Sequence, residues 1–145
     1  MNCSAEENIH LTIKEFVTGS HLVDHVFPSG VPTAIAGPNW ASNGTDEMSF
    51  CQKHFFELWK DRIQDIPIHQ VIEHFDCIGF MDVSDAQDWL PIWMCASYYA
   101  SQFGDASSAN IGQWTLNSLD LCIEAGRFFL PIESIQKFVT DFGES

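Results

Sequence analysis

The sequence predicts an all-α fold: a single-domain bundle of about six helices packed around a buried central helix at about residues 85–103. Three observations lead to this prediction. Apolar residues recur at helical spacing along most of the chain, and no stretch of useful length alternates apolar and polar residues as a strand would. The run from Ile78 to Phe103 becomes apolar on nearly every side, and such a helix must be covered by other elements.

The length of the chain indicates one domain, which we place at residues 1–145. A chain of 145 residues with 46% apolar residues can bury a sizeable core, and this composition excludes an intrinsically disordered protein. The central segment is near the lower length of a membrane span, but acidic and amide residues stand at its ends and Pro91 interrupts it. We therefore expect no membrane association.

The N-terminal part predicts a helix from about Ala5 to Thr18. Ser4 and Glu7 have the spacing of a capping box, in which each side chain satisfies a backbone N–H of the first turn. Gly19 is suited to end this helix, and a further short helical turn is expected between Ser20 and Phe27.

A loop rich in proline and glycine follows at about residues 28–44. Six of its residues are Pro or Gly, which excludes both a regular helix and a central strand. Loops of this length within a compact domain are often functional. Ile35 and Trp40 are the residues we expect to attach it to the core.

Two helices are predicted between this loop and the central helix. Thr45 or Asp46 caps the first, and Pro67 takes the first position of the second. Their apolar stripes consist of Met48, Cys51, Phe55, Leu58 and Trp59 in the first helix, and Ile68, Val71, Ile72, Phe75 and Ile78 in the second.

The C-terminal half predicts three helices. Ser84 is the expected cap of the central helix, and Pro91 lies deep enough inside it to kink it. A helix from Ala109 to Ala125 should stop at Gly126, and Pro131 should start the last one. The inward positions expected in the last helix are Ile135, Phe138, Val139 and Phe142.

The order of these signals resembles a family of small bacterial α-helical proteins that has no assigned function. The resemblance covers about two thirds of the chain, from Thr45 to Phe142, and it departs at the turn Val83–Ala86. It implies the helical fold and a bacterial origin, and it carries no catalytic residues. The motifs are Trp59…Ile66-Pro67…Ile78-Gly79-Phe80-Met81-Asp82…Trp89-Leu90-Pro91-Ile92-Trp93-Met94, followed by the helix Leu130–Val139.

The cysteines predict a reducing environment. Their number is odd, they are far apart, they form no CxxC pair, and the N-terminus is polar and acidic and so unlike a signal peptide. We therefore expect a cytoplasmic protein whose thiols are free and mostly buried. The five residues are Cys3, Cys51, Cys77, Cys95 and Cys122.

Charge is the most informative feature for function. Six Lys and Arg face 20 Asp and Glu, so the formal net charge is −14, which disfavours nucleic acid and anionic membranes as partners and favours a basic protein. Residues 63–126 contain no Lys or Arg but nine acids, although a solvated acidic face would have the same composition. We place the partner-binding surface at Asp65, Glu73, Asp76, Asp82, Asp85 and Asp88, with contributions from the loop 28–44.

Motifs for catalysis are weak throughout. His21, Asp24 and His25 could share one helical turn, a spacing used in metal sites, but no third ligand follows, and ordinary surface histidines are the simpler interpretation. His69 and Glu73 form an i, i+4 pair that needs no function. Since no nucleophile signature or phosphate-binding loop is present either, we expect no enzyme, cofactor or metal.

These observations favour a non-catalytic bacterial immunity protein, an antitoxin that neutralises a basic interbacterial toxin through an acidic surface. A nucleic-acid-mimicking inhibitor of a defence nuclease is the alternative, and it requires carboxylates spaced like phosphates along a surface. A small metal-dependent enzyme using His21–His25 or His69–His74 is the third hypothesis. The oligomeric state and the identity of the toxin do not follow from the residues.

Overall fold

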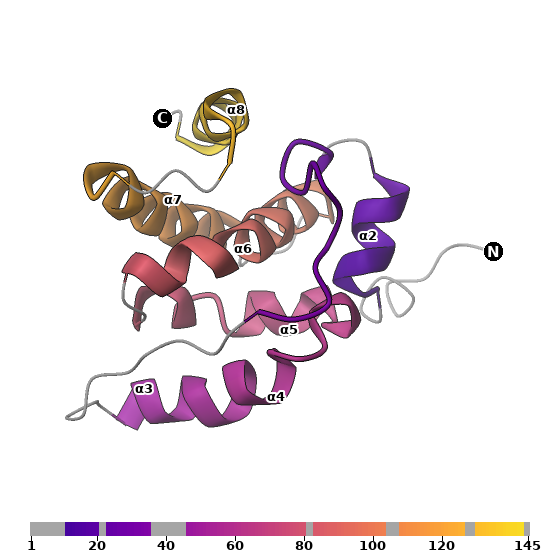
Figure 1. Cartoon of the computed structure of the whole chain (residues 1–145), viewed down its shortest axis with the longest axis vertical. Coiled ribbons are helices and arrows are strands. Elements are labelled where there is room, and N and C mark those ends of the chain that lie inside the picture. The colour runs from indigo at the N-terminus through magenta and orange to yellow at the C-terminus, as the bar shows by residue number, and fades with distance from the viewer. Residues whose placement is uncertain are drawn as a thin grey trace.

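The computed structural model describes residues 11–20, 23–35, 46–80, 83–103, 108–126 and 130–143. These residues confirm the all-α prediction. They form helices and turns, and their only β-type pairing is an isolated antiparallel bridge between Thr12 and Pro67. Figure 1 shows the longest helix, α6, crossing the middle of the molecule with the other elements around it.

Helix α6 (Val83–Phe103) is the central helix that the sequence predicts. Every residue from position 89 to position 100 is buried, because α5 (Ile68–Glu73), α7 (Ser108–Glu124) and α2 (Ile13–Gly19) all pack against it. Its start corrects one detail. Ser84, expected as the cap, lies inside the helix, because the helix begins at Val83 and not at about position 85.

Three polar side chains inside the core, Trp93, Ser97 and Thr115, are hydrogen-bonded, as their burial requires. The Trp93 indole N–H donates to the carbonyl of Phe75 at 2.9 Å. Ser97 donates to the carbonyl of Trp93 at 2.8 Å, and its hydroxyl lies 3.4 Å from that of Thr115 on α7. Thr115 in turn donates to the Ile111 carbonyl at 2.7 Å. The contact between the Ser97 and Thr115 hydroxyls links α6 to α7, and the Trp93 bond links α6 to the turn after α5.

Helix α2 starts later than predicted. Leu11 and Thr12 are not helical, and the helix begins at Ile13 with Thr12 as its cap. The Glu15 N–H donates to the Thr12 hydroxyl at 3.2 Å, and the Thr12 N–H donates to the Glu15 carboxylate at 3.0 Å. This second capping box, overlooked in the sequence, interrupts the single helix expected from position 5 to position 18. The box expected at Ser4 and Glu7 lies outside the described residues.

The next helix is continuous from position 46 to position 59 but contains a π-helical turn. It consists of α3 (Asp46–Cys51), η2 (Gln52–Phe56) and α4 (Glu57–Trp59). Because a π turn adds a residue, it rotates the side chains that follow. Phe55 and Phe56 are both fully buried, whereas Leu58, expected on the apolar stripe, is 48% exposed.

Short elements connect this helix to α6. They are η3 (Ile63–Asp65), α5, which Pro67 precedes as its cap, and η4 (Cys77–Phe80). The loop residues before α3 are hydrogen-bonded to the segment from Lys60 to Ile63. Ile35 N–H donates to the Lys60 carbonyl at 2.8 Å, and Ile63 N–H donates to the Thr33 carbonyl at 3.1 Å. Ile35 therefore attaches the loop as expected, and Trp40 lies outside the described residues.

Helices α7 and α8 (Ile132–Phe142) complete the fold. Gly126 follows the end of α7 with a positive φ of 77°, the conformation for which glycine is suited at a helix end. In α8, Ile135 and Phe138 are buried and Phe142 is partly buried, as expected, but Val139 is 37% exposed. Within the described ranges, no helix combines the length and apolar character needed to cross a membrane.

Candidate partner-binding site

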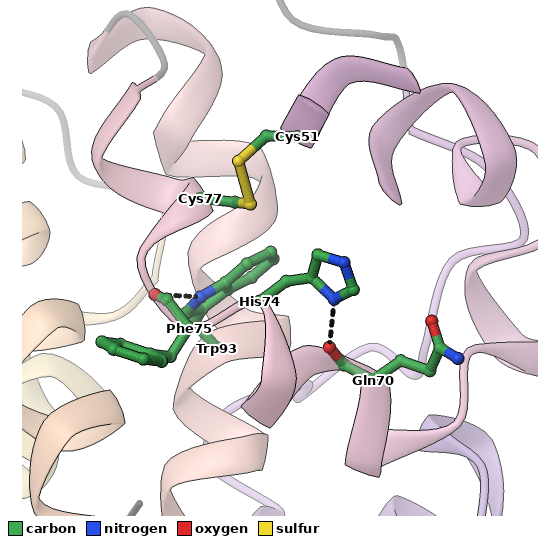
Figure 2. The surroundings of a disulfide bond; sticks show 6 residues. All are labelled: Cys51, Gln70, His74, Phe75, Cys77 and Trp93. Atoms are coloured by element: carbon green, nitrogen blue, oxygen red, sulfur yellow. Dashed lines mark hydrogen bonds between the residues drawn. A yellow bond between two sulfur atoms is a disulfide. The ribbon is translucent and has the colours of Figure 1, made fainter. Parts of the chain in front are cut away.

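A disulfide bond joins Cys51 at the end of α3 to Cys77 at the start of η4. Figure 2 shows the two side chains reaching toward each other from these segments. This bond overturns the expectation of free thiols for two of the five cysteines. Cys95 and Cys122 are buried thiols as expected, and Cys3 lies outside the described residues. The pairing had no signal in the sequence, because 26 positions separate partners that only the fold brings together.

An open pocket of about 530 Å³ surrounds the disulfide. We call it the acidic pocket. It has three carboxylates, one exposed phenylalanine and one histidine, and no Lys or Arg among the described residues that line it. The lining consists of Asp46, Phe50, Cys51, Glu73, His74, Asp76 and Cys77. A pocket of this chemistry suits a cationic side chain, which carboxylates attract and an aromatic ring can contact through its face.

Two ring side chains, Phe50 and His74, line the acidic pocket. The Phe50 ring, 53% exposed, stacks on His74 with ring centroids 5.8 Å apart and also contacts His54 at 4.5 Å. The His74 Nδ1–H donates to the carbonyl of Gln70 at 2.9 Å (Figure 2). Since a carbonyl can only accept, Nδ1 carries a proton.

Glu73 has a partner within its own helix. The His69 Nε2 lies 2.9 Å from the Glu73 carboxylate, which is the i, i+4 pair expected from the sequence. Both side chains are exposed, so the pair contributes little to stability. It does fix the position of Glu73 at the rim of the pocket.

The structure separates the predicted acids. Glu73 and Asp76 line the acidic pocket, whereas Asp88 lines a different pocket of about 310 Å³ together with Pro28, Gly30 and other loop residues. We call this second one the loop pocket. The loop and the start of α6, both expected to contact the partner, are thus brought together there. Burial, followed by the nearby Asp85 carboxylate, raises the pKa of Asp88.

One predicted acid, Asp65, lines neither of these pockets. Asp65 lines a third pocket with Thr12, Lys14 and Glu15. The lining of this pocket therefore includes a cation, Lys14. Asp82 lies outside the described residues. Four acids of the predicted partner-binding surface are therefore divided among three pockets.

A second cluster of titratable side chains lies between α6 and α8. The Tyr98 hydroxyl donates to the Asp141 carboxylate, His25 Nε2 lies 3.1 Å from the same hydroxyl, and Lys137 lies 3.5 Å from Asp141. Burial, followed by Lys137, lowers the pKa of His25. His25 thus packs against Tyr98 instead of presenting a metal-binding turn, and His21 lies outside the described residues.

No metal centre is assembled in the part of the chain that the structure describes. No group of three or more His, Cys, Asp or Glu side chains there has the arrangement needed to hold an ion.

Sequence reasoning missed Asp46 and Phe50. Asp46 precedes the cation-free segment, and charges were counted along the chain instead of in space. Phe50 did leave a signal, because it is a large apolar residue beside the predicted stripe, and such residues are often exposed for contact. His74 was considered only as part of a metal-binding pair.

Comparisons with known proteins give no further assignment: no family model matches this sequence, and neither does a curated protein or a solved structure. The similarity to a bacterial helical family therefore stays a prediction, together with the bacterial origin that it implies.

Proposed function

We propose that this protein is a non-catalytic immunity protein that binds and neutralises a basic interbacterial toxin. The observation that carries the proposal is the acidic pocket, which Asp46, Glu73 and Asp76 line together with an exposed Phe50 and whose described lining contains no Lys or Arg. An arginine or lysine of the toxin would enter this pocket, pair with the carboxylates and stack on the ring.

The charge of the chain supports the same partner class. A net charge of −14 accelerates the encounter with a basic protein and slows the approach of nucleic acid. A toxin that binds an anionic substrate must expose a basic cleft, and an inhibitor that covers this cleft needs carboxylates. The alternative, a mimic of nucleic acid, receives less support, because four acids of the predicted surface, Asp65, Glu73, Asp76 and Asp88, are divided among three pockets.

The cytoplasmic location predicted from the sequence is weaker support than the charge. It depended on free thiols, and structural disulfides persist mainly in oxidising compartments. We therefore propose a basic partner without assigning the compartment in which the two proteins meet.

A pull-down from the producing cell tests the proposal. The wild-type chain should retain a basic protein at low salt and lose part of it at high salt. Glu73→Gln with Asp76→Asn should lose most of the retained protein, whereas Asp120→Asn with Glu124→Gln, an equal change in charge on exposed positions of α7, should retain it.

The retained protein then decides the function. Its expression should stop bacterial growth, and co-expression of the wild-type chain should restore growth while the Glu73→Gln, Asp76→Asn variant should not. A retained protein that is harmless when expressed, or equal retention by both double variants, would contradict the proposal.

A further inference from the structure

The α3 wall of the acidic pocket is attached mainly through one residue. Among the α3 side chains that the structure describes, only Cys51 is buried, and Phe50 is half-exposed. The next fully buried side chain along the same helix is Phe55, which belongs to the π turn. The covalent bond to Cys77 therefore holds the end of α3 against the rest of the protein.

The disulfide also connects the two walls of the acidic pocket. Asp46 and Phe50 come from α3, whereas Glu73, His74 and Asp76 come from α5 and the turn that follows it. Besides the bond, the ring contact between Phe50 and His74 also joins the two walls. A stacked pair of this kind contributes about 1 kcal/mol or less, so it cannot replace a cross-link.

We propose that the Cys51–Cys77 disulfide is a redox latch, meaning a cross-link whose redox state controls binding. The oxidised form holds the two walls of the acidic pocket together around a basic side chain, and reduction releases α3 and weakens binding. The binding half of this proposal rests on the proposed function. A cellular dithiol supplies two electrons and two protons. Its thiolate attacks one sulfur, a mixed disulfide forms, and a second attack leaves Cys51 and Cys77 as thiols and the dithiol oxidised.

The surroundings of the bond favour exchange with an external dithiol over exchange within the chain. Both cysteines line the acidic pocket but are buried, with 3% and 1% of their surfaces exposed, so a thiolate reaches the sulfurs when α3, which has few buried side chains, opens locally. Cys95 lies on the buried side of α6, and burial raises its pKa, so it remains a thiol and a poor nucleophile. The latch therefore responds to the redox state outside the protein.

Hydrogen exchange of backbone amides tests the latch without any partner. A dithiol reductant should accelerate exchange in α3 by roughly ten- to a hundredfold, because α3 loses its cross-link to η4. Exchange in α8 should stay within about twofold of its rate in the oxidised protein. The Cys51→Ser, Cys77→Ser variant should behave like the reduced protein and should not respond to reductant. Unchanged exchange in α3 after reduction, or equal acceleration in α3 and α8, would overturn the latch.

An oligoarginine peptide tests the binding half, with oligoglutamate as the control peptide. Fluorescence anisotropy should give a Kd that rises by about tenfold on reduction, and the double serine variant should match the reduced value. Equal affinity in both redox states, with α3 released, would overturn the regulatory role. If the oxidised protein does not bind oligoarginine, the proposed function fails, and the exchange experiment still decides the latch on its own.

Discussion

Helices α6 and α3 are held in opposite ways. In α6, twelve consecutive residues from position 89 to position 100 are buried, and large aromatic side chains on neighbouring helices fill the space around them. In α3, one described side chain is buried, and that side chain is covalently bonded to another segment. Packing holds the first helix, and a cross-link holds the second.

This difference places stability and recognition in separate parts of the molecule. The packed segment of α6 from position 89 to position 100 has no surface to offer a partner, whereas α3 exposes Phe50 and Asp46 to solvent. Regions with few buried contacts open at a lower free-energy cost than the core. We therefore expect mutations in α6 to change the free energy of unfolding and mutations around α3 to change binding.

The largest effect should come from Trp93→Ala. The indole is fully buried, contacts the rings of Phe55 and Phe56, and donates to the Phe75 carbonyl. Its loss should lower the free energy of unfolding by about 3–5 kcal/mol, measured by urea denaturation. Leu121→Ala, at a position that is 55% exposed, should change it by less than about 0.5 kcal/mol. Comparable losses in the two variants would contradict the central position of α6.

The second-largest effect on the free energy of unfolding should come from removing the disulfide. Cys51→Ser with Cys77→Ser should lower the free energy of unfolding by about 3.5 kcal/mol, the value that chain entropy gives for a loop closed over 26 positions. Under reducing conditions wild type and variant should unfold at the same urea concentration. A variant as stable as the oxidised wild type would mean that packing, and not the bond, holds α3.

A smaller effect should appear with pH at the contact between α6 and α8. The folded state lowers the pKa of His25 through burial and Lys137, so the unfolded chain binds more protons. Stability should be full above the unfolded value of about 6.5 and should fall as the pH drops below it. His25→Gln retains an N–H for the Tyr98 hydroxyl and should flatten this part of the pH profile. Unfolding measured in urea at several pH values checks both chains.

The smallest effect should come from Asp88 at the loop pocket. Its pKa is raised, first by burial and then by Asp85, so its contribution to stability is present at low pH and is lost as the pH rises through the folded value. At neutral pH the ionised carboxylate is therefore unfavourable. Asp88→Asn should raise the midpoint of urea unfolding slightly at pH 7 and leave it unchanged in acid. A lower midpoint at pH 7 would indicate that the charge has a partner.

Much of the fold could be predicted from the sequence, because local patterns determine it. The apolar run of α6, the helix starts beside Pro67 and Pro131, and the stop at Gly126 are properties of neighbouring residues, although each proline lies one position before the first helical position that was predicted for it. Errors occurred where two local signals competed. The capping box at Thr12 interrupts a periodic helix, and the π turn moves Leu58 to the surface.

The candidate site could be predicted only in part, because it is assembled from distant segments. Glu73 and Asp76 were found through charge composition, which is visible in a linear count. Asp46, Phe50 and the disulfide depend on α3 meeting η4, and no local pattern determines that contact. The fold therefore adds to the sequence the spatial grouping of charges, which decides where a cationic side chain can be received.

The π turn from Gln52 to Phe56 has a consequence for sequence variation in this protein. The extra residue sets the angular phase between the solvent-facing Phe50 and the inward pair Phe55 and Phe56, which contact Trp89 and Trp93. Deleting one residue there would restore a regular helix and turn one of these groups away from its target. Chain length at this point should therefore tolerate less change than side-chain identity, and insertions or deletions should be selected against even where substitutions are harmless.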